Sequence, residues 1–305
     1  MRFGRVLVCG LLLAVVLGVA ACGPDQQGAT IVVGGADSTE HKLAGQLAVQ
    51  LLEARGYQVV DRTGGGDPAT VRADLAAGAI DVAWEFTGET WLSHLAHDQP
   101  LTDPALLWQR LTAEDSENGI VWVAQADYHS TLTMYVRLDL ATANKLLTLS
   151  DLGEYTRTVN ARTRLCTPEE LYGALQGVKG LVRAYNLSFD ESLVQFLSPT
   201  DGYRALAEGR CDCALASSLE DVTSPGPLRA LEDDRTFFHA SNLAVAVRAP
   251  VLEAHPELQA ALADLAAALT QQNMTDLYRQ VTVDRKDMAR VARTFLKDAG
   301  LLDKP

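Results

Sequence analysis

Cys22 carries the clearest chemical signal in this sequence. It follows the small residues Val19-Ala20-Ala21, which in turn follow a basic start and an apolar run over residues 6–17. A charged region, an apolar core and small residues before a cut site are the order of a secretory signal peptide, and a cysteine directly after the cut is typical of a lipid-attachment site. We therefore expect cleavage before Cys22, lipid on its sulfur and amine, and a mature chain tethered to a membrane outside the cytoplasm.

The alternative is a membrane-spanning helix over residues 6–21. That run is shorter than the roughly 20 residues that a spanning helix needs, and a segment containing glycine and proline follows at once. The alanine-rich stretch 262–269 is also short and contains Asp264. We therefore assign residues 1–21 to a signal peptide and residues 22–29 to a flexible linker.

Three more cysteines, Cys166, Cys211 and Cys213, remain in the mature chain. In an oxidising compartment two of the three are expected to pair. Cys211 and Cys213 would point to the same side of a strand over residues 211–216, so a bridge from Cys166 to either one is plausible. A bridge between Cys211 and Cys213 would be strained. A metal site would need a nearby histidine or a second close pair, so we expect a structural bridge or inert thiols, and no metal.

Other residues with catalytic chemistry lack the context that an enzyme requires. The segment 34–37 joins a predicted strand to a predicted helix, but it lacks the dinucleotide glycine pattern and a phosphate-loop lysine. Glu85 and Glu89 could form a carboxylate pair, and His94 and His97 could share a helix face. Neither pair has the surroundings of a hydrolase or a metal site, and no zinc-protease or serine-hydrolase motif occurs. We expect no catalysis and no cofactor.

Composition limits the remaining classes. The chain has 305 residues and a formal charge of −13. Loss of Arg2 and Arg5 with the signal takes this charge to −15, which argues against nucleic acid as a partner and keeps a tethered protein soluble. About 280 mature residues suit one large or two medium domains.

Short β-branched runs alternate with alanine- and leucine-rich amphipathic runs, which is the pattern of an α/β protein. Ser38 or Thr39 is expected to cap the first helix, with Glu40 near the positive end of its dipole, and Asp67 the second. In the first part of the chain the predicted strands are 30–34, 57–61, 80–83, 120–124 and 132–137, and the predicted helices 39–55, 67–78 and 101–117.

The pattern restarts after residue 138. The predicted helices are a short one from 150 or 151, one from 167, and 188–197, 201–208, 256–270, 273–281 and 285–299. The predicted strands are 181–184, 211–216, 228–231 and 242–247. The chain would cross between two α/β units near 128–140 and again near 232–242, and such crossings form hinges beside a ligand cleft. Lobe 1 would comprise 30–131 and 240–305, and lobe 2 would comprise 132–239.

Four long segments carry a family resemblance: residues 35–59, 63–91, 231–248 and 255–302. In order and spacing they resemble the substrate-binding proteins of ABC importers for glycine betaine, choline and related osmoprotectants. The resemblance covers essentially all of the mature chain. It implies a two-lobed, periplasmic-binding-protein-like fold of type II, with a cleft between the lobes and two crossing hinge segments. The ligand would be trapped as the lobes close.

The chain departs from this family where the ligand would sit. Family members usually hold a quaternary ammonium in a cage of tyrosines, by cation–π attraction. Where the family commonly has Tyr-Pro-Glu-Tyr-Thr-Gly, this chain has Ala83-Trp84-Glu85-Phe86-Thr87-Gly88, and the usual Asn-Asn-Thr-Tyr of the first hinge is replaced by residues 129–132. The Pro-Pro-Tyr of the returning segment becomes residues 239–241. An arginine that would grip a carboxylate has no counterpart near Gly173.

Two hypotheses for the ligand follow from these departures. The cage could be rebuilt from Trp84, Phe86 and Tyr128, or the pocket could be polar and bind another small solute. Thr39, Glu40, Glu85 and Thr87 keep the family's local pattern, although Thr39 and Glu40 could serve only to cap a helix. The expected ligand-binding residues are Thr39, Glu40, Trp84, Glu85, Phe86, Thr87, Tyr128, His129, Ser130, Thr131, Ser217, Ser218 and Asn242, and Glu220 is a further candidate in the polar alternative.

We therefore expect a monomeric, extracytoplasmic solute receptor, lipid-anchored through Cys22, that passes a small molecule to an ABC permease. Two other classes stay open. The same fold could present its ligand state to a signalling partner, or the chain could be an extracytoplasmic enzyme that turns over a solute through Glu85 or His129.

Overall fold

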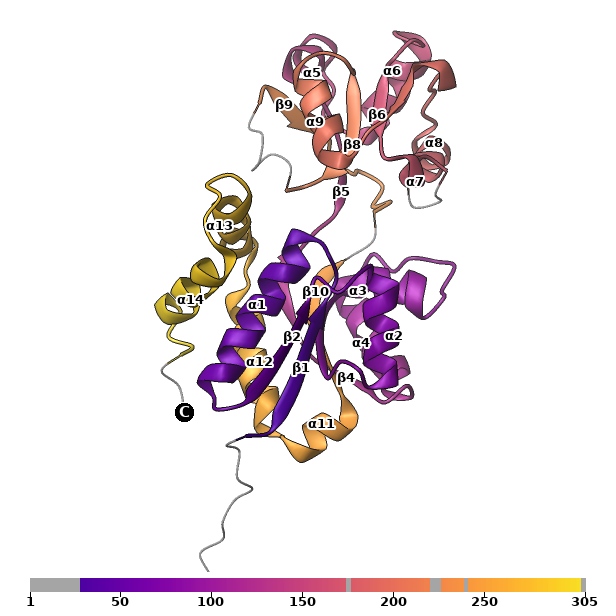
Figure 1. Cartoon of the computed structure of the whole chain (residues 1–305). Coiled ribbons are helices and arrows are strands. Elements are labelled where there is room, and N and C mark those ends of the chain that lie inside the picture. Colours follow the sequence, from indigo (N-terminus) through magenta and orange to yellow (C-terminus); the bar gives the residue numbers. More distant parts are fainter. Residues whose placement is uncertain (1–27, 174–176, 220–225, 239–240, 303–305) are drawn as a thin grey trace, which may run out of the picture.

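The computed structural model describes residues 28–173, 177–219, 226–238 and 241–302. They form two α/β lobes, one above the other in Figure 1, each built around a five-stranded sheet. The predicted two-lobed α/β fold is confirmed. The predicted signal peptide, Cys22 and most of the linker lie outside the described residues. Within these ranges, no helix is both long and apolar enough to cross a bilayer.

Lobe 1, the lower lobe in Figure 1, has the strand order β2-β1-β3-β10-β4. The strands are β1 (Thr30–Gly35), β2 (Gln58–Thr63), β3 (Val82–Phe86), β4 (Ile120–His129) and β10 (Asn242–Arg248). β1 runs parallel to β2 and β3, whereas β10 is antiparallel to β3 and β4. Consequently the carboxyl ends of β1, β3 and β4 and the start of β10 share one edge of the sheet, and this edge faces lobe 2.

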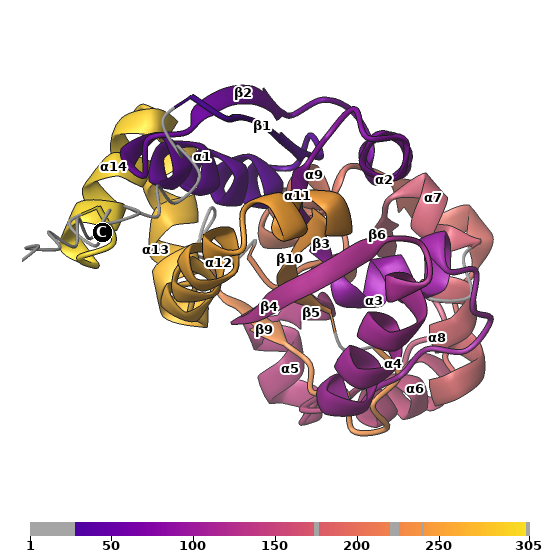
Figure 2. The same cartoon turned by 90° about the horizontal axis from the view of Figure 1, so that it is seen from below.

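Helices cover both faces of this sheet (Figures 1 and 2). One face packs on α1 (Thr39–Ala54), α12 (Glu257–Ala268), α13 (Gln271–Thr282) and α14 (Met288–Asp298). The other face packs on α2 (Pro68–Ala77) and α4 (Pro104–Ser116), near the short α3 (Thr87–Glu89) and the π-helical turn η1 (Thr90–His94). The short α11 (Ala249–Ala254) follows β10. All five residues of β3 are buried because β3 is central and covered on both sides.

The predicted caps of the first two helices can be compared with the structure. Ser38, rather than Thr39, caps α1, because its Oγ accepts from the His41 backbone N–H at 3.3 Å. Asp67 caps α2 and Gly78 ends it in the left-handed conformation, with φ of 81°, as predicted. Glycine adopts this conformation without steric cost.

Lobe 2 has the strand order β7-β6-β8-β5-β9. The strands are β5 (Leu132–Arg137), β6 (Leu165–Thr167), β7 (Val194–Phe196), β8 (Cys213–Ser217) and β9 (Leu228–Ala230). The helices are α5 (Leu138–Asn144), α6 (Leu149–Thr158), α7 (Glu169–Tyr172), α8 (Val178–Tyr185), the 3₁₀ turn η2 (Glu191–Leu193) and α9 (Pro199–Ala207). The chain passes between the lobes after β4 and again before β10.

Two predicted elements of lobe 2 were wrong. The predicted strand 181–184 lies inside α8, whose buried residues Val178, Leu181 and Tyr185 are spaced by three and four positions, the period of a helix. The predicted helix 188–197 is instead η2 followed by β7. Asp190 caps η2 by accepting from the Ser192 backbone N–H, and β7 then pairs in parallel with β6.

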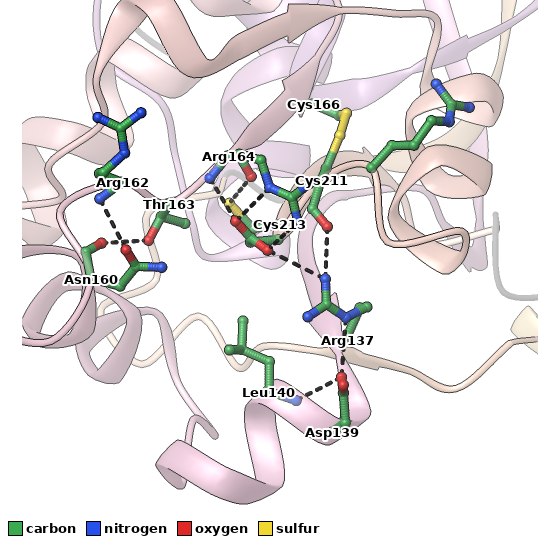
Figure 3. A network of polar contacts seen from close by, with 12 residues as sticks. Arg137, Asp139, Leu140, Asn160, Arg162, Thr163, Arg164, Cys166, Cys211 and Cys213 are labelled. Atoms are coloured by element: carbon green, nitrogen blue, oxygen red, sulfur yellow. Dashed lines mark hydrogen bonds and ion pairs between the residues drawn. A yellow bond between two sulfur atoms is a disulfide. The ribbon is translucent and has the colours of Figure 1, made fainter.

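A disulfide joins Cys166 of β6 to Cys211, with their Cα atoms 5.9 Å apart. This is one of the two pairings that the sequence left open. Cys213 is a buried free thiol in a different apolar cluster from the bridge. Arg137 and Arg164 lie beside the disulfide (Figure 3), and both bind the Asp212 carboxylate, at 3.3 Å and 2.8 Å.

Candidate functional site

Three elements meet where lobe 1 faces lobe 2. Ser130 lies on the first crossing segment, and its hydroxyl donates to Glu40 Oε1 at 3.4 Å. The Ser130 Oγ is also 3.4 Å from the Ser217 Oγ, at the end of β8 in lobe 2. The structure therefore brings together three residues that the sequence named separately. Thr39 is the first residue of α1 and is partly exposed beside them.

A hinge pocket of about 690 Å³ lies between the two crossing segments. Asn242, one of its lining residues, is held in place because its backbone N–H donates to Thr87 Oγ1 at 3.1 Å and its amide donates to the Ala126 carbonyl at 3.0 Å. Thr87 is buried and thus supports the position of Asn242 from inside lobe 1. The pocket is lined by Thr102, Pro104, Gln125, Ala126, Asp127, His129, Thr131, Asp233, Thr236, Phe238, Ser241 and Asn242.

A second pocket, which we call the α1 pocket, has a volume of about 520 Å³. It is lined by Ala36, Asp37, Ser38, Glu40, His41, Gly66, Asp67, Pro68, Phe86 and Glu89. Burial lowers the pKa of His41 to about 4, so its imidazole is neutral at pH 7. The His41 Nδ1 lies 2.8 Å from the Ser38 Oγ, and the ring packs edge to face on Phe86 with centroids 5.1 Å apart.

The charged side chains that line these two pockets are all negative. Among the described residues, their linings include the carboxylates of Asp37, Glu40, Asp67, Glu89, Asp127 and Asp233, and no lysine or arginine. Lys42 stands next to the α1 pocket but is ion-paired with Asp37. Burial raises the pKa of Glu89, which means that its surroundings do not fully stabilise its negative charge. A ligand with a positive charge would supply that stabilisation.

The three aromatic residues predicted as a possible cage lie mainly in the core. Trp84 and Tyr128 are 0% exposed, and both belong to the apolar cluster beneath α1. Phe86 is 8% exposed and borders the α1 pocket. The Phe86 and Tyr128 rings are tilted, with centroids 6.3 Å apart. Because two of the three rings are inaccessible, these side chains do not surround an open pocket in this structure.

A buried charge network lies beneath the α1 pocket. Glu85 Oε2 accepts from the Thr90 hydroxyl at 2.9 Å and lies 3.5 Å from Arg72 Nη1. Arg72 also pairs with Asp115, which accepts from Trp122 Nε1 at 2.7 Å. Among the described residues, Glu85 Oε1 is buried without a hydrogen-bond partner. The network links α2, β3, η1, α4 and β4, and thereby fixes the turn that carries Glu89.

The titration of Glu85 gives a testable pH dependence. Burial raises its pKa to about 7, although Arg72 and Thr90 act in the opposite direction. The folded state therefore binds a proton that the unfolded state releases near pH 4.5, so the contribution of Glu85 to stability is lost as pH rises through about 7. We expect the free energy of unfolding of Glu85→Gln, measured in urea titrations relative to that of the native chain, to increase between pH 4.5 and pH 8. A difference that stays constant with pH would contradict this expectation.

Sequence reasoning missed several lining residues. Asp37 was recognised only as part of a loop and Asp67 only as a helix cap, and neither His41 nor Asp233 was given a role. Asp233 accepts from the backbone N–H groups of Phe237 and Phe238, which shapes the returning segment beside the hinge pocket. Ser218 has a buried hydroxyl that lacks a partner among the described residues. The predicted candidate Glu220 and residues 239–240 lie outside the described residues.

Comparisons with known proteins agree with this architecture. The family described as the substrate binding domain of ABC-type glycine betaine transport system matches residues 29–298. A glycine-betaine-binding protein of Pseudomonas aeruginosa is 27% identical over 282 residues, covering 91% of this chain and 90% of that protein. Glycine betaine-binding protein YehZ of Escherichia coli is 25% identical, with 91% and 93% coverage.

A solved structure described as a glycine betaine/carnitine/choline ABC transporter superposes with a TM-score of 0.76, at 20% identity, over 90% of this chain and all of that one. At this identity the similarity supports the fold alone. The family match, by contrast, covers nearly the whole described chain and concerns solute-binding components of transport systems, not enzymes. This chain therefore belongs to the family of substrate-binding domains of ABC-type glycine betaine transport systems.

Proposed function

We propose that this chain is the lipid-anchored, extracytoplasmic solute-binding subunit of an ABC importer, and that it captures a small quaternary-ammonium cation between its lobes. The observation that carries this proposal is the charge of the two pockets: within the part of the chain that the structure describes, their linings hold six carboxylates and no lysine or arginine. Such a cleft attracts cations and repels anions during encounter and binding.

The names of the similar proteins support the same class of ligand. Glycine betaine, carnitine and choline share a trimethylammonium group. In the α1 pocket that group would lie beside the Phe86 ring and the carboxylates of Glu40 and Glu89. An aromatic face and nearby negative charges both stabilise such a cation. This chain would thus rely more on carboxylates than on a complete aromatic cage.

Capture would work through movement of the lobes about the two crossing segments. Glu40 of lobe 1, Ser130 of the hinge and Ser217 of lobe 2 already form one chain of hydroxyl and carboxylate groups. A ligand bound to this chain would contact both lobes, and it favours closure by its extra affinity for the closed state. The closed protein would then deliver the ligand to a permease, with the lipid on Cys22 keeping a monomeric receptor near the membrane.

A matched pair of ligands tests the need for positive charge. The first is choline. The second is 3,3-dimethylbutan-1-ol, the neutral analogue of choline in which a carbon atom replaces the nitrogen. We expect choline, at a hundredfold excess over its Kd, to stabilise the chain lacking residues 1–22 by about 2.7 kcal/mol. The neutral analogue, which has nearly the same shape, should give a much smaller effect.

Variants of α1 locate the charge that matters. Glu40→Gln should weaken choline binding by about tenfold in calorimetry, because one carboxylate of the α1 pocket is lost. Glu53→Gln, at an exposed position of the same helix, is the control and should leave the affinity unchanged. Equal binding of the neutral analogue, or stabilisation by anionic solutes only, would refute the proposed ligand class.

A further inference from the structure

We infer that the cleft prefers a cation whose other end is an uncharged hydroxyl group to a zwitterion whose other end is a carboxylate. This inference rests on the proposed function and selects a substrate class within it. Choline has such a hydroxyl, whereas glycine betaine and carnitine each carry a carboxylate. This preference depends on which groups around the cleft could pair with a negative charge.

Three positive side chains around the two pockets, Lys42, Arg72 and Arg235, already have partners. Lys42 is ion-paired with Asp37, at the rim of the α1 pocket. Arg235, on the returning segment, donates to the Ala184 carbonyl at 2.6 Å, and its guanidinium lies 5.2 Å from the centre of the Tyr185 ring. Arg72 is held beneath the α1 pocket by Glu85 and Asp115.

The segments of the chain between the described ranges add no positive charge. The sequence of residues 174–176, 220–225 and 239–240 contains no lysine or arginine, whereas residues 220 and 221 are Glu and Asp. No side chain in these segments could therefore act as an ion-pair partner for a carboxylate at neutral pH, apart from a protonated His239. Gly173, near which an arginine would be expected by resemblance, has no side chain to offer.

Next to Ser130, lobe 2 offers two hydroxyl groups. Ser217 lies 3.4 Å from Ser130, oxygen to oxygen, at the end of β8. The Ser218 hydroxyl is buried and has no hydrogen-bond partner among the described residues. A serine hydroxyl can donate to, or accept from, an alcohol, so it suits the neutral end of an amino alcohol. A carboxylate at the same place would be near Glu40, which accepts from Ser130.

The interior of lobe 1 adds another acceptor. Glu85 Oε1 is buried without a partner among the described residues, and Glu85 lines a narrow cavity that shares His41, Phe86 and Glu89 with the α1 pocket. A buried acceptor without a donor favours a positively charged or hydrogen-donating group close by. It penalises a second negative charge. The two lobes therefore agree in disfavouring a carboxylate on the ligand.

The test compares the affinities of choline and glycine betaine. Isothermal titration at pH 8 uses the whole chain, purified in detergent. We expect choline to bind at least about tenfold more tightly, because like charges placed close together are strongly unfavourable. Equal or tighter binding of glycine betaine would overturn the selectivity and leave the proposed function intact. If neither compound binds, both the proposed function and this inference fail.

A charge variant shows whether the carboxylates set the preference. In Glu89→Gln, choline should bind several-fold more weakly while glycine betaine is unchanged or improved, so the ratio of the two affinities falls. Glu117→Gln, at an exposed position next to α4, should keep the native ratio. Thermal unfolding of both variants checks that they fold. A ratio that is the same in Glu89→Gln and the native chain would overturn the assignment of selectivity to the pocket carboxylates.

Discussion

Replacement of Asp115 by alanine is expected to lower the free energy of unfolding by about 3–5 kcal/mol. Asp115 is 0% exposed in the last turn of α4. Its carboxylate pairs with Arg72, accepts from Trp122 Nε1 at 2.7 Å, and accepts from the Asn118 amide at 3.0 Å. Without it the Arg72 guanidinium would stay buried with Glu85 as its remaining charged partner. Urea unfolding, followed by circular dichroism, measures the loss.

Asp276→Ala is the matched control for this prediction. Asp276 is an exposed residue of α13, so its removal should change stability by no more than about 0.5 kcal/mol. A loss below about 1 kcal/mol in Asp115→Ala would contradict the view that Asp115 compensates a buried charge. Because the network fixes the turn that carries Glu89, weaker binding of choline should accompany the loss of stability.

Asp115 also shows which part of the buried charge network the sequence alone could not predict. Leu107, Leu111 and Asp115 follow one another at four-residue intervals, so Asp115 occupies the apolar stripe of α4. A charged residue in such a position indicates a buried partner. The sequence could not say that the partner is Arg72, because the packing of α2 against α4 decides it. Glu85 was named as a candidate, but its role in this network was not foreseen.

Local signals predicted lobe 1 well because its elements have clear ends. Asp67 with Pro68 begins α2, and Gly78 ends it, by side-chain and backbone chemistry that needs no tertiary partner. In lobe 2 the apolar run of α8 is short, and a short apolar run does not separate a strand from one turn of a buried helix. Packing of this segment in the core of lobe 2 accompanies the helix, and the sequence alone did not reveal that packing.

The aromatic residues of β3 illustrate the same limit within the site. Trp84 and Phe86 alternate with Ala83 and Glu85 along the strand, so their pattern predicts one shared face. In a central strand both faces are covered, and a sequence cannot distinguish a ligand cage from a packed core. Glu40, Ser130 and Ser217 were each named as candidates, but the sequence did not group them, because their contact depends on how α1, the first crossing segment and β8 meet.

Removal of the Cys166–Cys211 disulfide is expected to lower the free energy of unfolding by about 4 kcal/mol. The bridge closes a loop of 45 residues, and the chain-entropy cost of freeing such a loop in the unfolded state has this size. Both cysteines are buried beside Tyr203 and Leu206. The variant carries Cys166→Ala together with Cys211→Ala, and is compared with the native chain by urea unfolding without reductant.

Cys213→Ala separates the effect of the bridge from that of a lost buried sulfur. Cys213 is as buried as the bridged pair, but its thiol is free and contacts the Arg164 carbonyl at 3.7 Å. This variant should lose only about 1 kcal/mol, and a reductant should still destabilise it because its disulfide is intact. The double variant should not respond to the reductant. If both variants lost the same stability, the bridge would add nothing beyond packing, and lobe 2 would depend on its apolar clusters alone.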